Sequence, residues 1–427
     1  MRETRIITAI DVGTTKVCTI IGRRTGPGDM EVLAHSIVPS AGLKKGNVAD
    51  VAASERSIRT SIRDAESKAG VKIQSAYVGV TGAHVSFVNR SDELDWVSKH
   101  GVVTSDELSR VPGAVASSGA EPERIVIHAL PRTYTIDDQK GIRNPVGMHT
   151  SNLKVESHVV TGASSFTDKL VEAVENTGVQ VEGLVLEPLA SGEAVLTSTE
   201  MEQGAAIVDI GGGTTDIVVF KNGVVNYTAV IPVGGYQFTN DICLTYNTPF
   251  DAAESAKIAY AHTQPYVVGS NEDIALPVIG RTTERRLPRR DLCQLTRERA
   301  QELARLIRLK LQEAQIGDLA KARLVLTGGS SNLPGLEALM QQTVTNRVRI
   351  GIPNGHVPIP DELRAPAYAT SVGILLWGMN QTSPARTRSV SNGADTRNSI
   401  GSLITRLMEP LSRIFPEGLF STRRGRA

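Results

Sequence analysis

Two stretches of the chain share one pattern of apolar and polar positions. ITAIDVGTTKVCTI runs from Ile7 to Ile20, and IVDIGGGTTDIVVF runs from Ile207 to Phe220. Each has an apolar run, an aspartate, a turn of glycine and threonine, and a second apolar run, which predicts two strands joined by a tight turn. The two aspartates, Asp11 and Asp209, are 209 − 11 = 198 positions apart. The pattern therefore predicts one strand-turn-strand unit built twice.

The positions around these two units follow α/β patterning. Helical periodicity predicts helices at Ala52–Ala69 and Ser165–Asn176 and a charged helical block at Ala252–Gln315, and short apolar runs predict strands at Ser75–Gly82, Val181–Pro188 and Arg323–Gly329. Residues 83–160 have a different texture, with short β-like runs between charged and Pro/Gly-rich pieces. We interpret that span as an inserted small α/β subdomain.

Composition narrows the class of protein. The 427 residues include 46 basic and 45 acidic side chains, so the formal charge of +1 gives no sign of a nucleic-acid partner. The three cysteines, Cys18, Cys243 and Cys293, have no metal-type spacing and indicate reduced thiols. No apolar run approaches the roughly 20 residues of a membrane span, and the first residues lead directly into a strand. We expect a cytoplasmic protein.

The two turns are candidates for anion binding. A turn of Gly, Thr and Ser presents backbone N–H groups and hydroxyls to an anion without obstruction by Cβ atoms, and so can hold phosphate. Asp11 and Asp209 would end the preceding strands and hold the water shell of a Mg²⁺ ion that bridges phosphates. Two ordinary hairpins with glycine-rich turns are the alternative.

Two further features lie between and after these turns. RLVLTGGSSNLPGL, at Arg323–Leu336, again runs from an apolar strand into Gly328, Gly329 and Ser330, where backbone can pack flat against a base or ribose. Glu187 in LVLEPLASGEAVL follows a strand and precedes a helix, so its carboxylate could orient a water molecule as a base. A simple charge at a helix N-terminus is the alternative for Glu187.

These elements, in this order, resemble the actin-like ATPase superfamily of actin, DnaK-type chaperones and sugar kinases. The resemblance implies a duplicated actin-like (ribonuclease-H-like) α/β fold that binds ATP and Mg²⁺ between its halves. APAYATSVGIL, near the end, is similar to the superfamily's second connecting helix. The nucleotide-binding residues that the resemblance implies are Asp11, Gly13, Thr14, Thr15 and Lys16 in the first loop, Gly211, Gly212, Gly213 and Thr214 in the second, Gly234 and Gly235 in a further turn, Glu254 and Lys257 near ribose and adenine, and Gly328, Gly329 and Ser330.

Within the superfamily the chain resembles the bacterial cell-division family FtsA, through GLKKGNVAD, VRIGIP and the insert LPRTYTIDDQKGIRNPVGMHTSNLKVESHVVTG. This family carries its insert where actin has a different subdomain. We expect the first core half in residues 1–82 with 161–197 and 360–380, an inserted subdomain of FtsA type in 83–160, the second core half in 198–242 with 300–359, a small nucleotide and partner subdomain in 243–299, a flexible linker in 381–400 and an amphipathic helix in 401–415.

The C-terminal helix is predicted from its period alone. Its apolar side chains fall within an arc of roughly 140° at 100° per residue; they are Leu403, Ile404, Leu407, Met408, Leu411, Ile414 and Phe415. The preceding linker lacks apolar periodicity and is rich in Ser, Asn, Thr and Arg. A helix this short cannot span a bilayer, but it can lie in the interface of an anionic membrane. Docking into the protein's own core or a partner's groove is the alternative, and Pro410 should kink the helix.

An arginine-rich segment precedes the third turn. It holds Arg285, Arg286, Arg289, Arg290, Arg297 and Arg299. Such a run is usually a solvated face. In the FtsA family this region receives the acidic tail peptide of the tubulin-like division protein FtsZ, and arginines suit carboxylates through bidentate contacts. We expect Arg299 first, and Arg286 with it, to contact that peptide.

The resemblance to the FtsA family, with the C-terminal helix, implies an ATP-binding, actin-like division protein that polymerises on the inner face of the cell membrane and tethers FtsZ to it. Later division proteins would bind through the inserted subdomain. Weak ATPase activity, with Glu187 and Asp209 as the candidate catalytic residues, is left open. The alternatives are a PilM-like pilus-assembly module or a sugar-kinase-type phosphotransferase of the same fold; neither needs the helix at 401–415.

Overall fold

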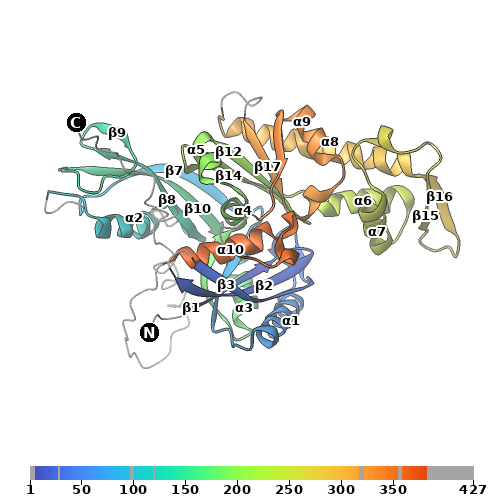
Figure 1. The fold of residues 1–427 in the computed structure, drawn as a ribbon, viewed down its shortest axis with the longest axis horizontal. Coiled ribbons are helices and arrows are strands. Elements are labelled where there is room, and N and C mark those ends of the chain that lie inside the picture. The colour runs from blue at the N-terminus through green and yellow to red at the C-terminus, as the bar shows by residue number, and fades with distance from the viewer. Residues whose placement is uncertain are drawn as a thin grey trace, which may run out of the picture.

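The computed structural model describes residues 5–26, 29–96, 101–118, 121–316, 322–353 and 358–381. Two five-stranded sheets form the centre of the molecule, and two smaller subdomains extend from them to opposite sides (Figure 1). The helix predicted at 401–415, with the linker before it, lies outside the described residues. None of the helices described is both long enough and apolar enough to cross a bilayer.

The first sheet is built around the first strand-turn-strand unit. Its central strand pairs antiparallel with the next strand on one side and parallel with the next strand on the other. The strands, in spatial order, are β11 (Gln180–Leu186), β6 (Ser75–Val80), β1 (Arg5–Val12), β2 (Lys16–Gly26) and β3 (Asp29–Pro39). A short hairpin of β4 (Leu43–Lys44) and β5 (Asn47–Val48) follows β3.

The second sheet repeats this arrangement. Its strands, in spatial order, are β14 (Val224–Ile231), β13 (Thr215–Lys221), β12 (Ala205–Ile210), β17 (Arg323–Thr327) and β18 (Arg347–Ile350). Read in this direction, they correspond to β3, β2, β1, β6 and β11 of the first sheet. β12 pairs antiparallel with β13 and parallel with β17, as β1 does with β2 and β6. The predicted duplicated actin-like fold is confirmed.

Helices cover both sheets. The helices of the first half are α1 (Val51–Ala69), α3 (Ser164–Glu175) and α4 (Glu187–Val195), and α10 (Ala369–Asn380) returns to it from the end of the second half; α5 (Ser198–Gln203) and α9 (Leu336–Thr343) cover the second half. Short 3-10 turns stand at Gly329–Asn332 (η3), Asp361–Leu363 (η4) and Pro366–Tyr368 (η5). α10 lies across the first sheet and against α4 (Figure 1). A Cβ on Gly373 would lie 1.8 Å from the carbonyl oxygen of Ala190, so the two helices touch backbone to backbone.

The inserted subdomain is attached in sequence to the first half but also contacts the second. Its sheet has the order β7 (Ser86–Glu93), β10 (Leu153–Ala163), β8 (Arg124–Ile136) and β9 (Gln139–Ile142), with α2 (Ser105–Ser118) packed on it. Asn89 Nδ2 donates to the carbonyl of Asn226 on β14, at 3.2 Å. His158 Nε2 lies 3.3 Å from the Thr228 hydroxyl on the same strand.

The small subdomain differs from the sequence prediction. It contains α6 (Gly235–Tyr246), α7 (Phe250–Tyr260), the 3-10 turn η1 (Pro265–Val267), β15 (Asp273–Pro277), β16 (Glu284–Pro288) and the start of the long α8 (Arg289–Glu313). From Ala300 onward α8 packs in the core of the second sheet. The block at Ala252–Gln315 was expected to be helical throughout, and that expectation is wrong for its middle. There β15 and β16 form an antiparallel hairpin in which Ile274 and Leu287 are buried. Each strand has only five residues, so its alternation of apolar and polar positions is too short to be recognised within a charged segment that otherwise has helical periodicity.

Candidate functional site

The two predicted turns have the same backbone geometry. The Gly13 N–H donates to the Lys16 carbonyl at 3.0 Å, and the Gly211 N–H donates to the Thr214 carbonyl at 2.9 Å. Each bond closes a strand-turn-strand hairpin in which the aspartate stands two residues before the bonded glycine. The sequence echo is therefore also a structural repeat.

The structure brings these two turns into contact with each other. A Cβ on Gly212 would lie 2.5 Å from Cγ2 of Thr15, and one on Gly213 would lie 2.7 Å from Oγ1 of Thr14. The Tyr236 hydroxyl donates to the Thr14 carbonyl at 3.3 Å. The close approach requires glycine in the second turn, because any side chain there would collide with the first.

Helices α4 and α10 hold the two aspartates. Ser371 of α10 donates its hydroxyl to Asp11 at 2.6 Å. Asp209 accepts hydrogen bonds from Ser191 of α4 and from Thr370 of α10, the latter at 3.0 Å. α10 therefore bonds to both hairpins, and the two carboxylates are fixed relative to each other.

Four carboxyl groups share the space behind the turns. Burial raises the pKa of Asp11 and of Asp209 above their ordinary value. Burial raises the pKa of Asp216 to about 7, and the charge of Asp209 acts in the same direction. Burial, followed by the charges of Asp11, Asp216 and Asp209, holds the pKa of Glu187 well above its usual range. Full ionisation of all four carboxyl groups is therefore unfavourable.

This donor set fits a phosphate with a divalent cation. The glycine turns offer N–H groups to an anion, Lys16 supplies a positive charge beside Asp11, and the carboxylates offer oxygen ligands. Mg²⁺ needs only one or two carboxylates because it keeps several waters. Within the described ranges no three His, Cys, Asp or Glu side chains are grouped as a metal site.

The third turn and the turn at Gly234 meet the second hairpin from its other end. The Ser330 hydroxyl donates to the Gly211 carbonyl at 2.9 Å, and the Gly235 N–H donates to the same carbonyl, also at 2.9 Å. A Cβ on Gly234 would lie 2.7 Å from that oxygen. Gly328, with φ +82, leaves no room for a side chain, because its Cβ would meet the Asp209 carboxylate.

Glu254 and Lys257 stand on α7 beside this turn. Lys257 Nζ pairs with Glu254 at 2.7 Å and donates to the carbonyl of Gly235 at 3.2 Å. The Thr239 hydroxyl bonds to both side chains. Gly234, Gly235, Glu254, Lys257 and Ser330 are thus brought together.

Several residues of this site were not predicted from the sequence. They are Thr81, Ser191, Asp216, Thr370 and Ser371. Asp216 accepts hydrogen bonds from Thr81 and, at 2.8 Å, from Thr214. Two signals could have found most of them. Asp216 lies inside the repeated stretch itself, and Thr370 and Ser371 lie in APAYATSVGIL, the stretch similar to a connecting helix. Thr81 lies at the end of the predicted strand at Ser75–Gly82 and carries no such signal.

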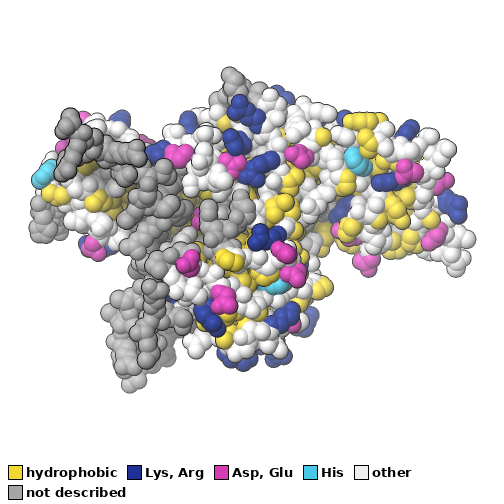
Figure 2. Space-filling view, in the orientation of Figure 1, with side chains coloured by type: hydrophobic (Ala, Val, Ile, Leu, Met, Phe, Trp, Pro, Cys, Tyr) yellow, Lys and Arg dark blue, Asp and Glu magenta, His cyan; other side chains and the backbone are white. Residues whose placement is uncertain are grey.

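The two arginines proposed for partner binding, Arg286 and Arg299, lie on different elements and have different surroundings. Arg299 of α8 pairs with Asp241 of α6 through two bonds, at 2.6 and 2.8 Å, and also with Glu302. Arg286 is exposed on β16. On the face seen in Figure 2, basic and acidic side chains are interspersed over this subdomain. The seven residues predicted to bind membrane, Leu403 to Phe415, lie outside the described residues.

Sequence relatives cover nearly the whole chain. The family model "Cell division protein FtsA" matches residues 206–373, and "SHS2 domain inserted in FTSA" matches residues 82–161. The cell division protein FtsA of Pseudomonas aeruginosa is 36% identical over 397 residues, 91% of this chain and 93% of that protein. FtsA of Escherichia coli K12 is 32% identical over 383 residues, covering 88% of this chain and 91% of the relative.

Solved structures agree on the fold. A chain of the PilM-PilN type IV pilus biogenesis complex matches with a TM-score of 0.61 at 18% identity, over 88% of this chain and 99% of the other. MreB 5 of Spiroplasma citri bound to AMPPNP matches with a TM-score of 0.50 at 14% identity, over 88% and 95%. Identities this low establish the actin-like fold alone, whereas the FtsA relatives, at 32% and 36% identity over most of the chain, establish the family. The chain belongs to the FtsA family of cell-division proteins.

Proposed function

We propose that this division protein binds ATP with Mg²⁺ between its two hairpins. The single observation that carries the proposal is the pair of equivalent turns in contact, each backed by a buried aspartate that the connecting helices hold in place. Helix and turn N–H groups bind phosphate, and carboxylates orient the hydration shell of the ion. The bound AMPPNP of the MreB 5 neighbour, an ATP analogue, supports this choice of ligand.

The remaining site residues would contact the other parts of the nucleotide. Gly328, Gly329 and Ser330, with Glu254 and Lys257, would face the adenosine. Glu187 stands at the first position of α4 among the aspartates, where its carboxylate can orient a water molecule toward the terminal phosphate. Hydrolysis would then be slow, and Glu187→Gln should abolish it while leaving ATP binding intact; an unchanged rate would remove Glu187 from this role.

The second part of the proposal is attachment to the membrane and polymerisation. The apolar arc from Leu403 to Phe415 would lie in the interface of an anionic bilayer, where each fully buried large apolar side chain contributes roughly 1.5 to 3 kcal/mol. One helix of this length binds weakly. A polymer that presents many such helices in a row would attach firmly, because each further contact forms at a high effective concentration.

The third part is the tethering of FtsZ, with later division proteins bound through the inserted subdomain. The acidic FtsZ tail would contact the small subdomain. Arg286 is exposed on β16 and can receive a carboxylate directly, whereas Arg299 would have to share its guanidinium with Asp241. Charge reversal of Arg286 should therefore weaken binding of an FtsZ tail peptide more than charge reversal of Arg299. Equal affinities for wild type and both variants would exclude the two residues.

Co-sedimentation of the full-length protein with anionic liposomes, with and without Mg-ATP, tests the proposed function. Wild type should pellet with the liposomes, and more so with Mg-ATP, if the nucleotide promotes assembly. The variant Leu407→Asp with Leu411→Asp should stay in the supernatant, while Ser412→Ala, on the opposite face of the arc, should behave as wild type. Pelleting of a protein that lacks residues 401–427 would contradict the membrane assignment.

A further inference from the structure

The hairpin β4–β5 has an unusual turn. Its two central residues, Lys45 and Gly46, have φ of +51 and +77. Positive φ at both positions is the mark of a type I′ turn, where Asn-Gly, Asp-Gly and Gly-Gly are preferred. Lysine carries a full side chain on the strained left-handed backbone at the first position. Lys45 therefore departs from the residues that such turns prefer, as five other described non-glycine residues with positive φ do elsewhere in the chain, so its placement has to carry the argument.

This turn belongs to the first half of the molecule but lies on the second hairpin. A Cβ on Gly213 would come within 2.9 Å of Lys45 Cα and 3.2 Å of its backbone nitrogen. A Cβ on Gly46 would lie 3.3 Å from Cγ2 of Thr214 and 3.0 Å from Cγ2 of Thr81. The backbone of Lys45, which belongs to the first half, is thus packed against the glycine turn of the second half.

The position of Lys45 along the second hairpin is also defined. The Gly211 end of that turn is bonded to Gly235 and Ser330, on the side proposed for adenosine. The Gly213 end meets Thr14 and Lys45. A nucleotide whose base faces the Gly211 end therefore extends its terminal phosphate toward the Gly213 end. This step rests on the proposed function.

Lys45 is exposed, and a phosphate group at the Gly213 end of the turn would give its ammonium group an anion to pair with. The site gathers Asp11, Glu187, Asp209 and Asp216, and Lys16 is the cation whose charge acts on Asp11, Glu187 and Asp209. A third phosphate group adds negative charge at the end of the turn that lies farthest from the adenosine side. We propose that Lys45 binds the terminal phosphate of the nucleotide and makes the site prefer a nucleoside triphosphate over a diphosphate.

The test compares three variants of the full-length chain by calorimetric titration with Mg-ATP and with Mg-ADP. Lys45→Asn keeps the turn, because asparagine favours this backbone conformation, and removes the charge. Lys45→Arg keeps the charge. Lys44→Asn removes the neighbouring exposed lysine of the same hairpin and is the matched control.

Lys45→Asn should weaken the binding of Mg-ATP by about tenfold and change that of Mg-ADP by less than about twofold. Lys45→Arg and Lys44→Asn should keep the preference of wild type. Equal losses for both nucleotides, or a Lys44→Asn variant that matches Lys45→Asn, would overturn the proposal. If wild type binds ATP and Lys45→Asn binds it equally well, the inference fails and the proposed function stands; if wild type binds no nucleotide, both fail.

Discussion

The two hairpins share a backbone but not their chemistry. In the first, Asp11 stands opposite Cys18 across the strand pair; in the second, Asp209 stands opposite Asp216. The first turn is followed by Lys16, whereas the second turn is all glycine between Ile210 and Thr214. The first hairpin therefore supplies a cation and hydroxyls, and the second supplies a backbone cradle with two carboxylates.

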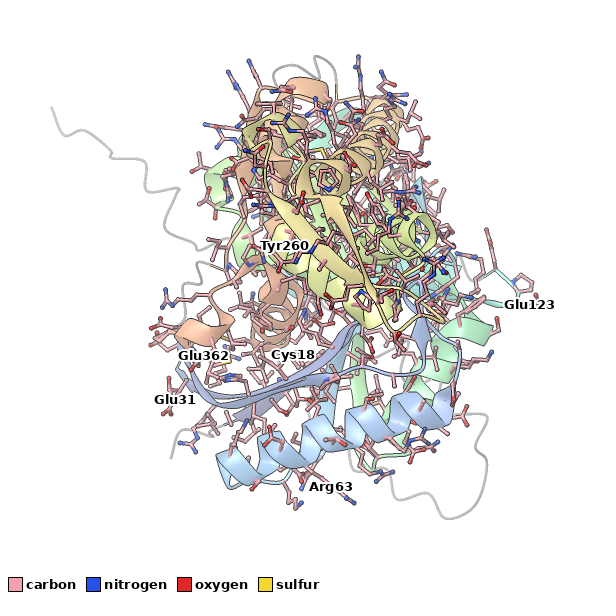
Figure 3. The ribbon with its side chains drawn as sticks, turned by 90° about the vertical axis from the view of Figure 1, so that its right-hand side faces the viewer. Cys18, Glu31, Arg63, Glu123, Tyr260 and Glu362 are labelled. Atoms are coloured by element: carbon pink, nitrogen blue, oxygen red, sulfur yellow. The ribbon has the colours of Figure 1, made fainter. Side chains whose placement is uncertain are left out.

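This difference shows what duplication leaves free to change. The strand order and the closing hydrogen bond are equal in both halves, because the sheet geometry depends on them. The position opposite the aspartate is free to differ, since it is buried in both halves but contacts different neighbours. Cys18, on β2 of the first sheet, is buried, while Arg63 of α1 faces outward (Figure 3). Burial, with the nearby charge of Asp11, raises the pKa of the Cys18 thiol to about 12, so this side chain stays neutral.

The largest predicted effect concerns the helices that join the halves. Gly373→Ala would place a Cβ 1.8 Å from the Ala190 carbonyl oxygen and force α10 away from α4, which should lower the free energy of unfolding by about 3 kcal/mol or more. Gly192 is the matched glycine of α4. Its Cβ would meet no backbone atom, and its nearest neighbour would be the ring of Phe220 at 3.1 Å, so Gly192→Ala should cost about 1 kcal/mol. Urea denaturation of both variants measures the difference; equal midpoints would show that the helices can separate without loss.

The next effect depends on pH and concerns the insert, which links the halves through His158. Burial, with the charge of Arg132, lowers the pKa of His158 to about 3, and burial lowers that of His128 to about 3 as well. At these two histidines the unfolded chain therefore binds more protons than the folded one below pH 6.5. Their contribution to stability should fall as the pH drops from about 6.5 toward 3, by up to ~1.4 kcal/mol per pH unit for each histidine, while the raised pKa values of Asp216 and Glu187 act in the opposite direction.

Unfolding measured at pH 7.5 and pH 5 tests this dependence. His158→Gln should reduce the difference between the two pH values, and His149→Gln, at an exposed histidine of the same subdomain, should leave it as in wild type. An equal pH dependence of stability in wild type and in His158→Gln would contradict the burial of a neutral His158.

The smallest predicted effect compares the two unequal positions. Cys18→Ala should reduce stability by about 1 kcal/mol through a small cavity and leave the affinity for Mg-ATP within about twofold of wild type. Asp216→Asn should weaken Mg-ATP binding further, because the Asp216 carboxylate anchors the Thr214 hydroxyl of the second turn at 2.8 Å. Equal affinities for the two variants, measured by calorimetry, would show that the hairpins are chemically interchangeable.

Much of this architecture could be predicted from short-range patterns. The two hairpins, α1 and α3 follow from apolar periodicity and glycine turns, which act over a few residues. Glu187 was placed correctly between a strand and a helix for the same reason.

The contacts between distant segments could not be predicted. Periodicity says nothing about the pairing of Arg299 with Asp241, 58 positions away, or about the turn at Lys45 that lies on Gly213. The bonds of His158 and Asn89 to β14 were hidden for the same reason. Such contacts depend on how the two halves dock, which no local pattern encodes.

The most direct test of the account is the Mg²⁺ dependence of ATP binding in Asp11→Asn and Asp209→Asn. Asparagine keeps the volume of each side chain and still accepts a hydrogen bond from Ser371 or Thr370, so the fold should survive, as circular dichroism would check. In wild type, removal of Mg²⁺ should weaken ATP binding by about tenfold or more, and each variant should lose most of that dependence, because a carboxylate has left the water shell of the ion. ATP affinity that depends on Mg²⁺ equally in wild type and both variants would contradict a nucleotide held between the two hairpins.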